Sequence, residues 1–223
     1  MRARQHGLTI AFGTIFVLAL IGQSIAGLGV FNEEQVSHGL SPVSYGEFVT
    51  SSEFVVDVAE NWQSEYLQFF LFIFATIWLV QKGSPESKKP GDEGLGSDKD
   101  QLVREHALRN SPKWAKVSGW RHTLFSNSLL IVMGTIFILS WLAQSLSGLV
   151  VFNAEQVDHG QQLISWGEYL VSADFWNRTL QNWQSEFLAV GSMIALSVYL
   201  RQRGSPESKP VGTPHDATSI TPD

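Results

Sequence analysis

Two carboxylate–imidazole pairs are the side chains of this sequence best suited to chemistry. Glu34 stands four residues before His38, and Glu155 stands four residues before His159. Residues four apart on a helix lie on one face about a turn apart, so both side chains of a pair can bind one cation. Two further carboxylates near later apolar stretches could complete the sites. The predicted metal ligands are Glu34, His38, Glu65, Glu155, His159 and Glu186.

This set of oxygen and nitrogen donors suits a divalent transition metal such as zinc, manganese or iron. Helical bundles that bind two metals typically use Glu-x-x-His spacing, which this chain lacks. A second interpretation assigns His38 and His159 to pH sensing, because an unperturbed imidazole titrates near about pH 6.5. A structural interpretation also stays open, in which Glu34 and His38 form a surface pair and Glu65 favours the positive N-terminal end of its helix.

No catalytic or cofactor-binding residue is predicted, and we expect a protein that is not an enzyme. The sequence has no Gly-x-Ser-x-Gly, no His-Glu-x-x-His and no Gly-rich phosphate loop. It has no cysteine, which excludes disulfides and thiolate metal sites. The net charge is −6 and no dense basic patch is present, which argues against nucleic acid as a partner.

The elements that would position these residues occur twice in the chain. Residues 6–88 align without a gap to residues 127–209 at a constant offset of 121, and 39 of the 83 positions are identical. Segments 31–39, 61–65 and 83–88 recur as 152–160, 182–186 and 204–209. We call 6–88 the first copy and 127–209 the second copy. The repeat predicts the same helices twice.

Apolar residues are bunched into long stretches. Leu8–Phe31 contains 24 residues without a charge, which is enough to cross a hydrocarbon core of about 30 Å. We expect an all-α membrane protein with four transmembrane helices, at about 8–31, 62–81, 127–152 and 183–201. Its two helical hairpins would be tandem repeats of parallel orientation. No ionisable residue falls within the uninterrupted apolar stretches, which argues against an ion-coupled transporter.

The first apolar stretch also has features of a secretory signal, with Ser24-Ile25-Ala26 as a small-x-small site. The second copy carries Ser145-Leu146-Ser147 at the equivalent place in a helix that cannot be a signal. We therefore expect the first helix to be retained.

The distribution of charge predicts the orientation in the membrane. Of the 15 basic residues, 14 lie outside segments 32–65 and 153–186, which hold only Arg178 together with 12 acidic residues. By the positive-inside rule both termini and the central linker are cytoplasmic, and the acidic segments face outward. The expected domains are repeat 1 at 1–88, a cytoplasmic linker at 89–126 with an interfacial segment at about 112–122, repeat 2 at 127–209 and a disordered tail at 210–223.

Local signals mark the helix ends outside the membrane. Gly39 and Gly160 are suited to end the long helices on the outer side. Ser44 with Glu47 has the spacing of a capping box, and Ser165 with Glu168 repeats it.

The motifs Phe-Asn-x-Glu-Gln-x-x-His-Gly, Ser-x-Gly-Glu and Asn-Trp-Gln-Ser-Glu resemble those of a bacterial integral-membrane family of unknown function. The resemblance covers both copies but not the linker or the tail. It implies a location in the bacterial cytoplasmic membrane, and it implies no catalytic residue, substrate or partner.

Three functions stay open. The leading hypothesis is a non-enzymatic structural or interaction protein of the bacterial envelope, whose partners are the lipid bilayer and either a further copy or another membrane protein. The second is a metal-binding membrane protein that uses the Glu and His sets. The third is a passive channel or a transporter subunit.

Overall fold

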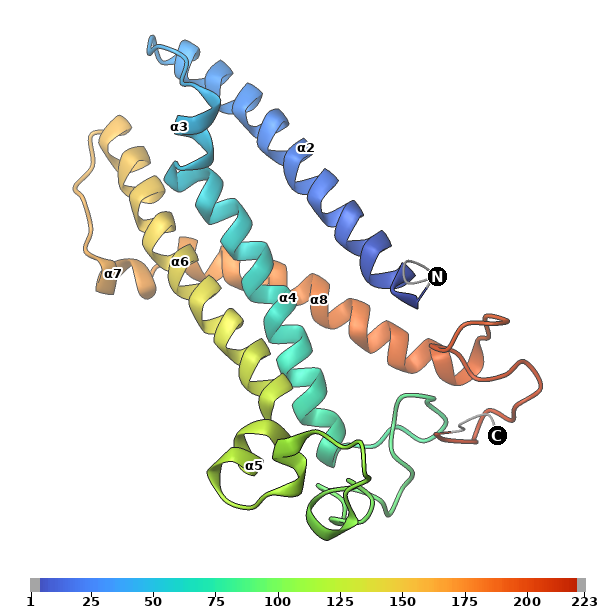
Figure 1. Cartoon of the computed structure of the whole chain (residues 1–223). Helices are drawn as coiled ribbons and strands as arrows, with labels where there is room; N and C mark the ends of the chain where they lie inside the picture. The colour runs from blue at the N-terminus through green and yellow to red at the C-terminus, as the bar shows by residue number, and fades with distance from the viewer. Residues whose placement is uncertain (1–4, 220–223) are drawn as a thin grey trace. The chain divides into compact units, whose positions relative to one another are not determined.

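The computed structural model describes residues 5–219, and this range is built of helices and loops without strands (Figure 1). The helices are α2 (Gly7–Ser37), α3 (Tyr45–Val49), α4 (Ser52–Trp78), α5 (Trp120–Ser126), α6 (Ser128–Asp158), α7 (Trp166–Leu170) and α8 (Ala173–Tyr199), with short 3-10 helices η1 (Arg104–His106) and η2 (Lys113–Lys116) in the linker. The prediction of an all-α protein is confirmed.

The helices of the first copy and those of the second begin and end at equivalent residues. Adding 121 to the bounds of α2, α3 and α4 gives the bounds of α6, α7 and α8. The paired helices have 31, 5 and 27 residues. Local sequence signals therefore set the same helix boundaries in both halves of the chain.

Both predicted capping boxes are present at the start of the short helices α3 and α7. The Ser44 hydroxyl accepts a hydrogen bond from the backbone N–H of Glu47, whose carboxylate accepts one from the backbone N–H of Ser44. Ser165 and Glu168 repeat the arrangement. Because these hydrogen bonds favour the ionised carboxylates, they lower the pKa of both Glu47 and Glu168.

Two helices, α2 and α6, are long and apolar enough to cross a membrane, in the part of the chain that the structure describes. The structure supports these two crossings by length and composition and not the four that we expected. The physical reason lies in α4 and α8, whose first halves are polar. The apolar stretch in each begins at Tyr66 or Phe187, and the helices end at Trp78 and Tyr199.

The described residues form two compact units, which we treat separately. Unit one contains residues 5–59 and 143–172, and unit two contains residues 60–142 and 173–219. In unit one, α3 lies on α2 and α7 lies on α6, with one aromatic ring of each short helix over a glycine of the long helix. Phe48 contacts Gly27, and Tyr169 contacts Gly148. Both rings are buried, at 3% and 1% exposed.

An asparagine side chain closes the loop that leads to each short helix. Asn32 accepts a hydrogen bond of 2.7 Å from the backbone N–H of Val43 and donates one of 3.1 Å to its carbonyl. Asn153 makes the same two bonds to Ile164, at 2.9 and 3.0 Å. A side-chain amide thus pairs with a peptide group in both copies.

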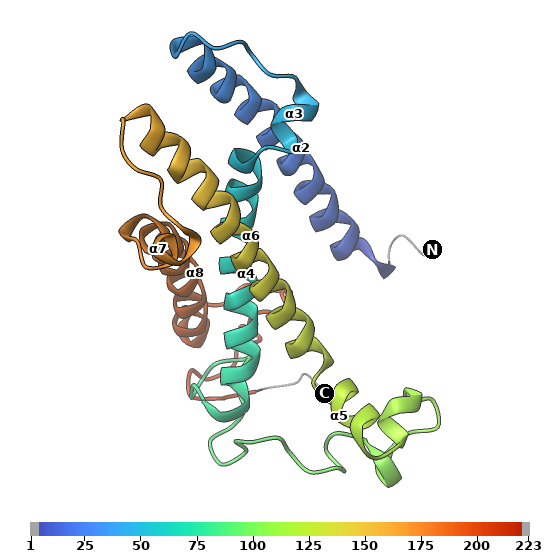
Figure 2. The same ribbon diagram turned by 90° about the vertical axis from the view of Figure 1, so that its left-hand side faces the viewer.

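In unit two, helices of the first copy pack on helices of the second within one chain. Figure 2 shows α4 alongside α6, and Figure 1 shows α8 crossing α4. The Phe70 ring of α4 lies against Gly134 of α6, where an added Cβ would come within 3.0 Å of it. Trp141 of α6 contacts the rings of Phe175, Trp176 and Trp183 of α8 at centroid distances of 5.9 to 6.1 Å.

The described part of the tail belongs to unit two and is hydrogen-bonded within it. The backbone N–H of Gly83 donates a hydrogen bond of 2.8 Å to the hydroxyl of Thr218. The ammonium of Lys209 donates to the carbonyls of Pro214, His215 and Ala217, and the residue is 1% exposed. Burial lowers the pKa of this ammonium. The disorder that we predicted for 210–223 awaits measurement, and residues 220–223 lie outside the described range.

Candidate functional site

A polar pocket of about 340 Å³ lies between α4 and α8 in unit two. Glu60 is its residue from α4, and the α8 residues have the spacing of a single helical face. Six polar side chains line it: Glu60, Asp174, Asn177, Arg178, Gln181 and Asn182. Because both charge signs and several amides border one cavity, its chemistry is that of hydrogen bonding and ion pairing.

Arg178 stands between two carboxylates of this pocket. Its Nη1 lies 3.6 Å from Oε2 of Glu60 on the neighbouring helix, and its Nε lies 3.5 Å from Oδ2 of Asp174 one turn earlier on α8. All three side chains are about two thirds buried or more, at 31%, 19% and 32% exposed. Their mutual attraction is therefore screened less than that of ion pairs in open water.

A hydrogen-bonded amide fixes the two helices beside the pocket. The Trp183 indole N–H donates a hydrogen bond of 2.8 Å to Oε1 of Gln63, whose Nε2 donates one of 3.1 Å to the carbonyl of Glu60. Gln63 is fully buried, at 0% exposed. Loss of the Trp183 N–H would leave a buried acceptor without this partner, which makes the contact sensitive to mutation.

The predicted metal ligands are divided between the two units. Four of them lie at the C-terminal ends of α2 and α6 in unit one, where Glu34, His38, Glu155 and His159 are all exposed. The His159 ring bonds the backbone carbonyl of Glu155 at 2.8 Å rather than its carboxylate. Among residues 5–219 no three His, Asp or Glu side chains are placed to hold a metal ion. The metal site stays a prediction.

The other two predicted ligands lie in unit two, near enough for their charges to interact. Glu65 of α4 and Glu186 of α8 are equivalent residues of the two copies, and their carboxylates interact electrostatically. Equivalent residues of the two copies therefore lie near each other where α4 and α8 pack.

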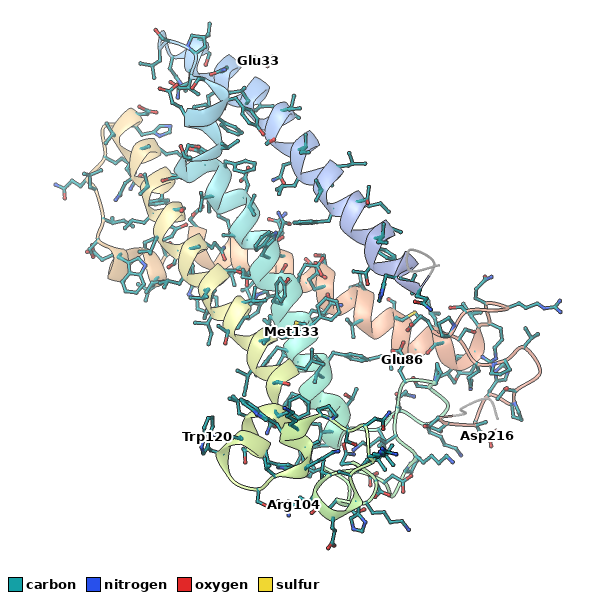
Figure 3. All side chains as sticks on the ribbon, viewed as in Figure 1. Glu33, Glu86, Arg104, Trp120, Met133 and Asp216 are labelled. Atoms are coloured by element: carbon teal, nitrogen blue, oxygen red, sulfur yellow. The ribbon has the colours of Figure 1, made fainter. Side chains whose placement is uncertain are left out.

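A second pair of equivalent carboxyls lies past the C-terminal ends of the same helices. Glu86, labelled in Figure 3, lies near enough to Glu207 for the two carboxyls to interact. Burial, with a further contribution from the neighbouring Glu207 carboxyl, raises the pKa of Glu86 to about 7. Glu86 also borders a mainly apolar cavity of about 280 Å³ that includes Phe72 of α4 and Ile194 of α8.

Our sequence reasoning missed the pocket and the buried amide. One signal for the pocket was present, because Arg178 is the single basic residue of the two acidic segments. Gln63 belongs to the repeated motif at 61–65 and 182–186, yet the sequence does not tell which of the repeated residues meet. The Trp183 indole packs on Trp141 and donates its N–H to Gln63.

Comparison with known proteins gives a family but no activity. Neither a curated protein nor a solved structure matches the chain. A family match covers residues 1–220, and the chain belongs to the family described as "Domain of unknown function (DUF6766)".

Proposed function

We propose that this chain is an integral membrane protein of the bacterial cytoplasmic membrane with a structural or interaction role rather than an enzymatic one. The observation that carries the proposal is the exposure of α2. Ser24 is the one buried residue of this helix, all of which is described. Apolar side chains along its length face outward, including Leu8 at 75% and Phe12 at 68% exposed. Water disfavours such a surface, whereas lipid accommodates it.

The apolar halves of α4 and α8 complete a four-pass topology in this proposal. Both halves also expose large apolar side chains, such as Phe74 of α4 at 47% and Leu188 of α8 at 67%. The basic residues concentrate before α2, between α4 and α6 and after α8, which matches an arrangement with both termini inside. An apolar stretch shorter than the bilayer can be accommodated by local thinning.

The interaction role is supported by apolar side chains on the outer loops and short helices of unit one. They are Leu40, Tyr45, Leu163, Trp166 and Val171, all at least 43% exposed. Tyr45 and Trp166 are equivalent residues of the two copies. Tyrosine and tryptophan are enriched at surfaces that bind other proteins.

The topology is tested by single cysteines, because the natural chain has none. Ser41→Cys, Ser97→Cys and Gln162→Cys are labelled in intact cells with a maleimide that does not cross membranes. Four crossings predict that positions 41 and 162 react and that position 97 reacts only after permeabilisation. Two crossings, by α2 and α6 alone, predict that positions 41 and 97 react and that position 162 is protected. Release of the protein from membranes by alkaline carbonate would overturn the membrane assignment.

The interaction role is tested with a photo-crosslinking residue at position 163 or 166 in living cells. A defined crosslinked product, either a second copy or one membrane protein, is expected. Solute flux through purified protein in liposomes, together with the absence of any crosslinked product, would favour the channel hypothesis and overturn the interaction role.

A further inference from the structure

The polar pocket between α4 and α8 contains both charge signs in one cavity. Arg178 supplies a guanidinium, Glu60 and Asp174 supply carboxylates, and Asn177, Gln181 and Asn182 supply amides. The volume of about 340 Å³ lies at the lower end of the range for small-molecule sites, but the lining is polar where such sites are mostly apolar. The ligand that suits this pocket is small, hydrophilic and itself charged at both signs.

We propose that this pocket binds a zwitterionic phosphoethanolamine group, supplied by the headgroup of a phospholipid. The proposal rests on the membrane location argued above. A guanidinium fork matches the paired oxygens of a phosphate, for which arginine is the preferred side chain. A primary ammonium has three N–H donors, and the Glu60 and Asp174 carboxylates are its natural acceptors. The flanking amides can both donate and accept.

The pocket lies on the polar side of the expected crossings. Glu60 and Arg178 stand two and five residues before Trp62 and Trp183, where the expected crossings begin, and six and nine residues before the apolar stretches. At the rise of an α-helix, Glu60 is about 3–9 Å and Arg178 about 7.5–13.5 Å from the hydrocarbon core. The headgroup layer on each side of this core is about 5–8 Å deep. The pocket therefore borders the headgroup layer rather than the hydrocarbon core.

The two copies differ at this site, which predicts one ligand per chain. The residues of the first copy equivalent to Asn177 and Arg178 are Val56 and Asp57. A second site built from these residues would lack the guanidinium that receives the phosphate. Of the five α8 residues that line the pocket, only Asn182 is identical in the first copy, and the change from Asp57 to Arg178 supplies the group that binds an anion.

The test measures lipids retained by the full chain. The protein is purified in mild detergent with equal amounts of phosphatidylethanolamine, phosphatidylcholine and phosphatidylglycerol, and bound lipid is counted by native mass spectrometry. Phosphatidylcholine keeps the phosphate but has no N–H donor, and phosphatidylglycerol lacks the cation. We expect one phosphatidylethanolamine per chain, at least about tenfold preferred over the other two, since charge-assisted hydrogen bonds are about twice as strong as neutral ones. Equal retention of the three lipids would overturn the proposal.

Substitutions in the pocket test whether the retained lipid is bound there. Arg178→Gln is expected to lower retention about tenfold, because it removes the phosphate partner. Asn177→Val, which introduces the first-copy residue, is expected to lower it by less. Arg121→Gln removes one arginine from α5 and is the charge-matched control, expected to retain the lipid as the parent does. Retention by Arg178→Gln equal to that of the parent would overturn the proposal, provided that its tryptophan fluorescence shows the parent fold.

A soluble probe shows whether the pocket binds a phospholipid headgroup or a soluble ligand of the same chemistry. Glycerophosphoethanolamine at millimolar concentration is added to the lipid-depleted protein. Selective lipid retention without binding of this probe supports the lipid source. Binding of the probe together with no lipid preference would overturn the lipid source and assign the pocket to a soluble zwitterion. Failure of lipid selectivity in a protein whose cysteine labelling shows four crossings would reject this inference and leave the proposed function intact.

Discussion

The long helices α2 and α6 have the same length and equivalent bounds, yet their surroundings differ. Gly134 of α6 lies against the Phe70 ring, whereas no described atom lies within 4 Å of the Cβ position at Gly13, the equivalent residue of α2. Trp141 of α6 packs on three aromatic rings of α8, and its equivalent in α2 is Leu20. α6 also buries Ser140, Gln144, Ser145 and Val151, and α2 buries Ser24. Repetition of sequence fixes where a helix begins and ends, but single substitutions decide what it packs against.

The largest expected effect comes from removing the aromatic contact of α6. Trp141→Ala should lower the free energy of unfolding by about 3 kcal/mol, because truncating a packed aromatic side chain loses its burial and leaves a cavity. Leu20→Ala in α2 is the matched control and should cost much less. Unfolding in detergent, followed by tryptophan fluorescence during titration with a denaturing detergent, measures both. Equal losses would contradict the difference between the two helices.

The glycines give a second test of the same difference. Gly134→Val should destabilise by about 1–3 kcal/mol, because the added side chain meets the Phe70 ring and over-packs the contact. Gly13→Val makes the same change in helix propensity, and its Cβ meets nothing within 4 Å among the described residues. Melting temperatures of the two variants should therefore separate. If both variants melt together, the α4–α6 contact is not present in solution.

The tryptophans of the repeated Asn-Trp-Gln-Ser-Glu motif should also respond unequally. Trp183→Phe removes the N–H that bonds the buried Gln63 amide and should cost about 1–3 kcal/mol. Trp62, its first-copy equivalent, is 40% exposed, so Trp62→Phe should cost less. Double replacement of Trp183 by Phe and Gln63 by Leu should recover part of the loss. A double variant less stable than the sum of the two single losses would contradict this explanation.

The smallest expected effect is a dependence on pH that differs between Glu86 and Glu47. The pKa of Glu86 is raised from 4.5 to about 7, so the folded state keeps the proton after the unfolded chain has released it. Its contribution to stability is complete below about pH 4.5 and is lost as the pH rises through about 7. The pKa of Glu47 is lowered from 4.5, so its contribution is present above that pH and is lost as the pH falls.

Melting temperatures between pH 4 and pH 8 measure these opposite trends. Glu86→Gln should flatten the decline of stability toward pH 8, and Glu47→Gln should flatten the decline toward pH 4. A decline toward pH 8 that persists in Glu86→Gln would show that another group causes it.

Features encoded by neighbouring residues could be predicted from the sequence. Both capping boxes, the positive φ of Gly39 at 74° and Gly160 at 66°, and the all-α fold depend on local chemistry. The number of crossings was harder to predict, because α4 and α8 join polar and apolar halves in one helix. The pocket at Arg178 and the electrostatic interaction of Glu65 with Glu186 could not be predicted, since they depend on which faces of α4 and α8 meet. A repeated sequence places the same residue types in both copies, so it does not show which copy supplies the residue that makes a given contact.

The paired hydrogen bonds of Asn32 and Asn153 bear on how the chain folds during synthesis. Each asparagine bonds a peptide group 11 residues later in the chain. Closing so short a loop takes about 10–100 ns, far less than the ribosome needs to add the next residue. Each turn between a long helix and its short partner can therefore form as soon as it emerges, before the following apolar stretch leaves the ribosome. The asparagine-bonded turn of the first copy would then form before that of the second copy. The contacts between the copies would form only after the second copy has been synthesised.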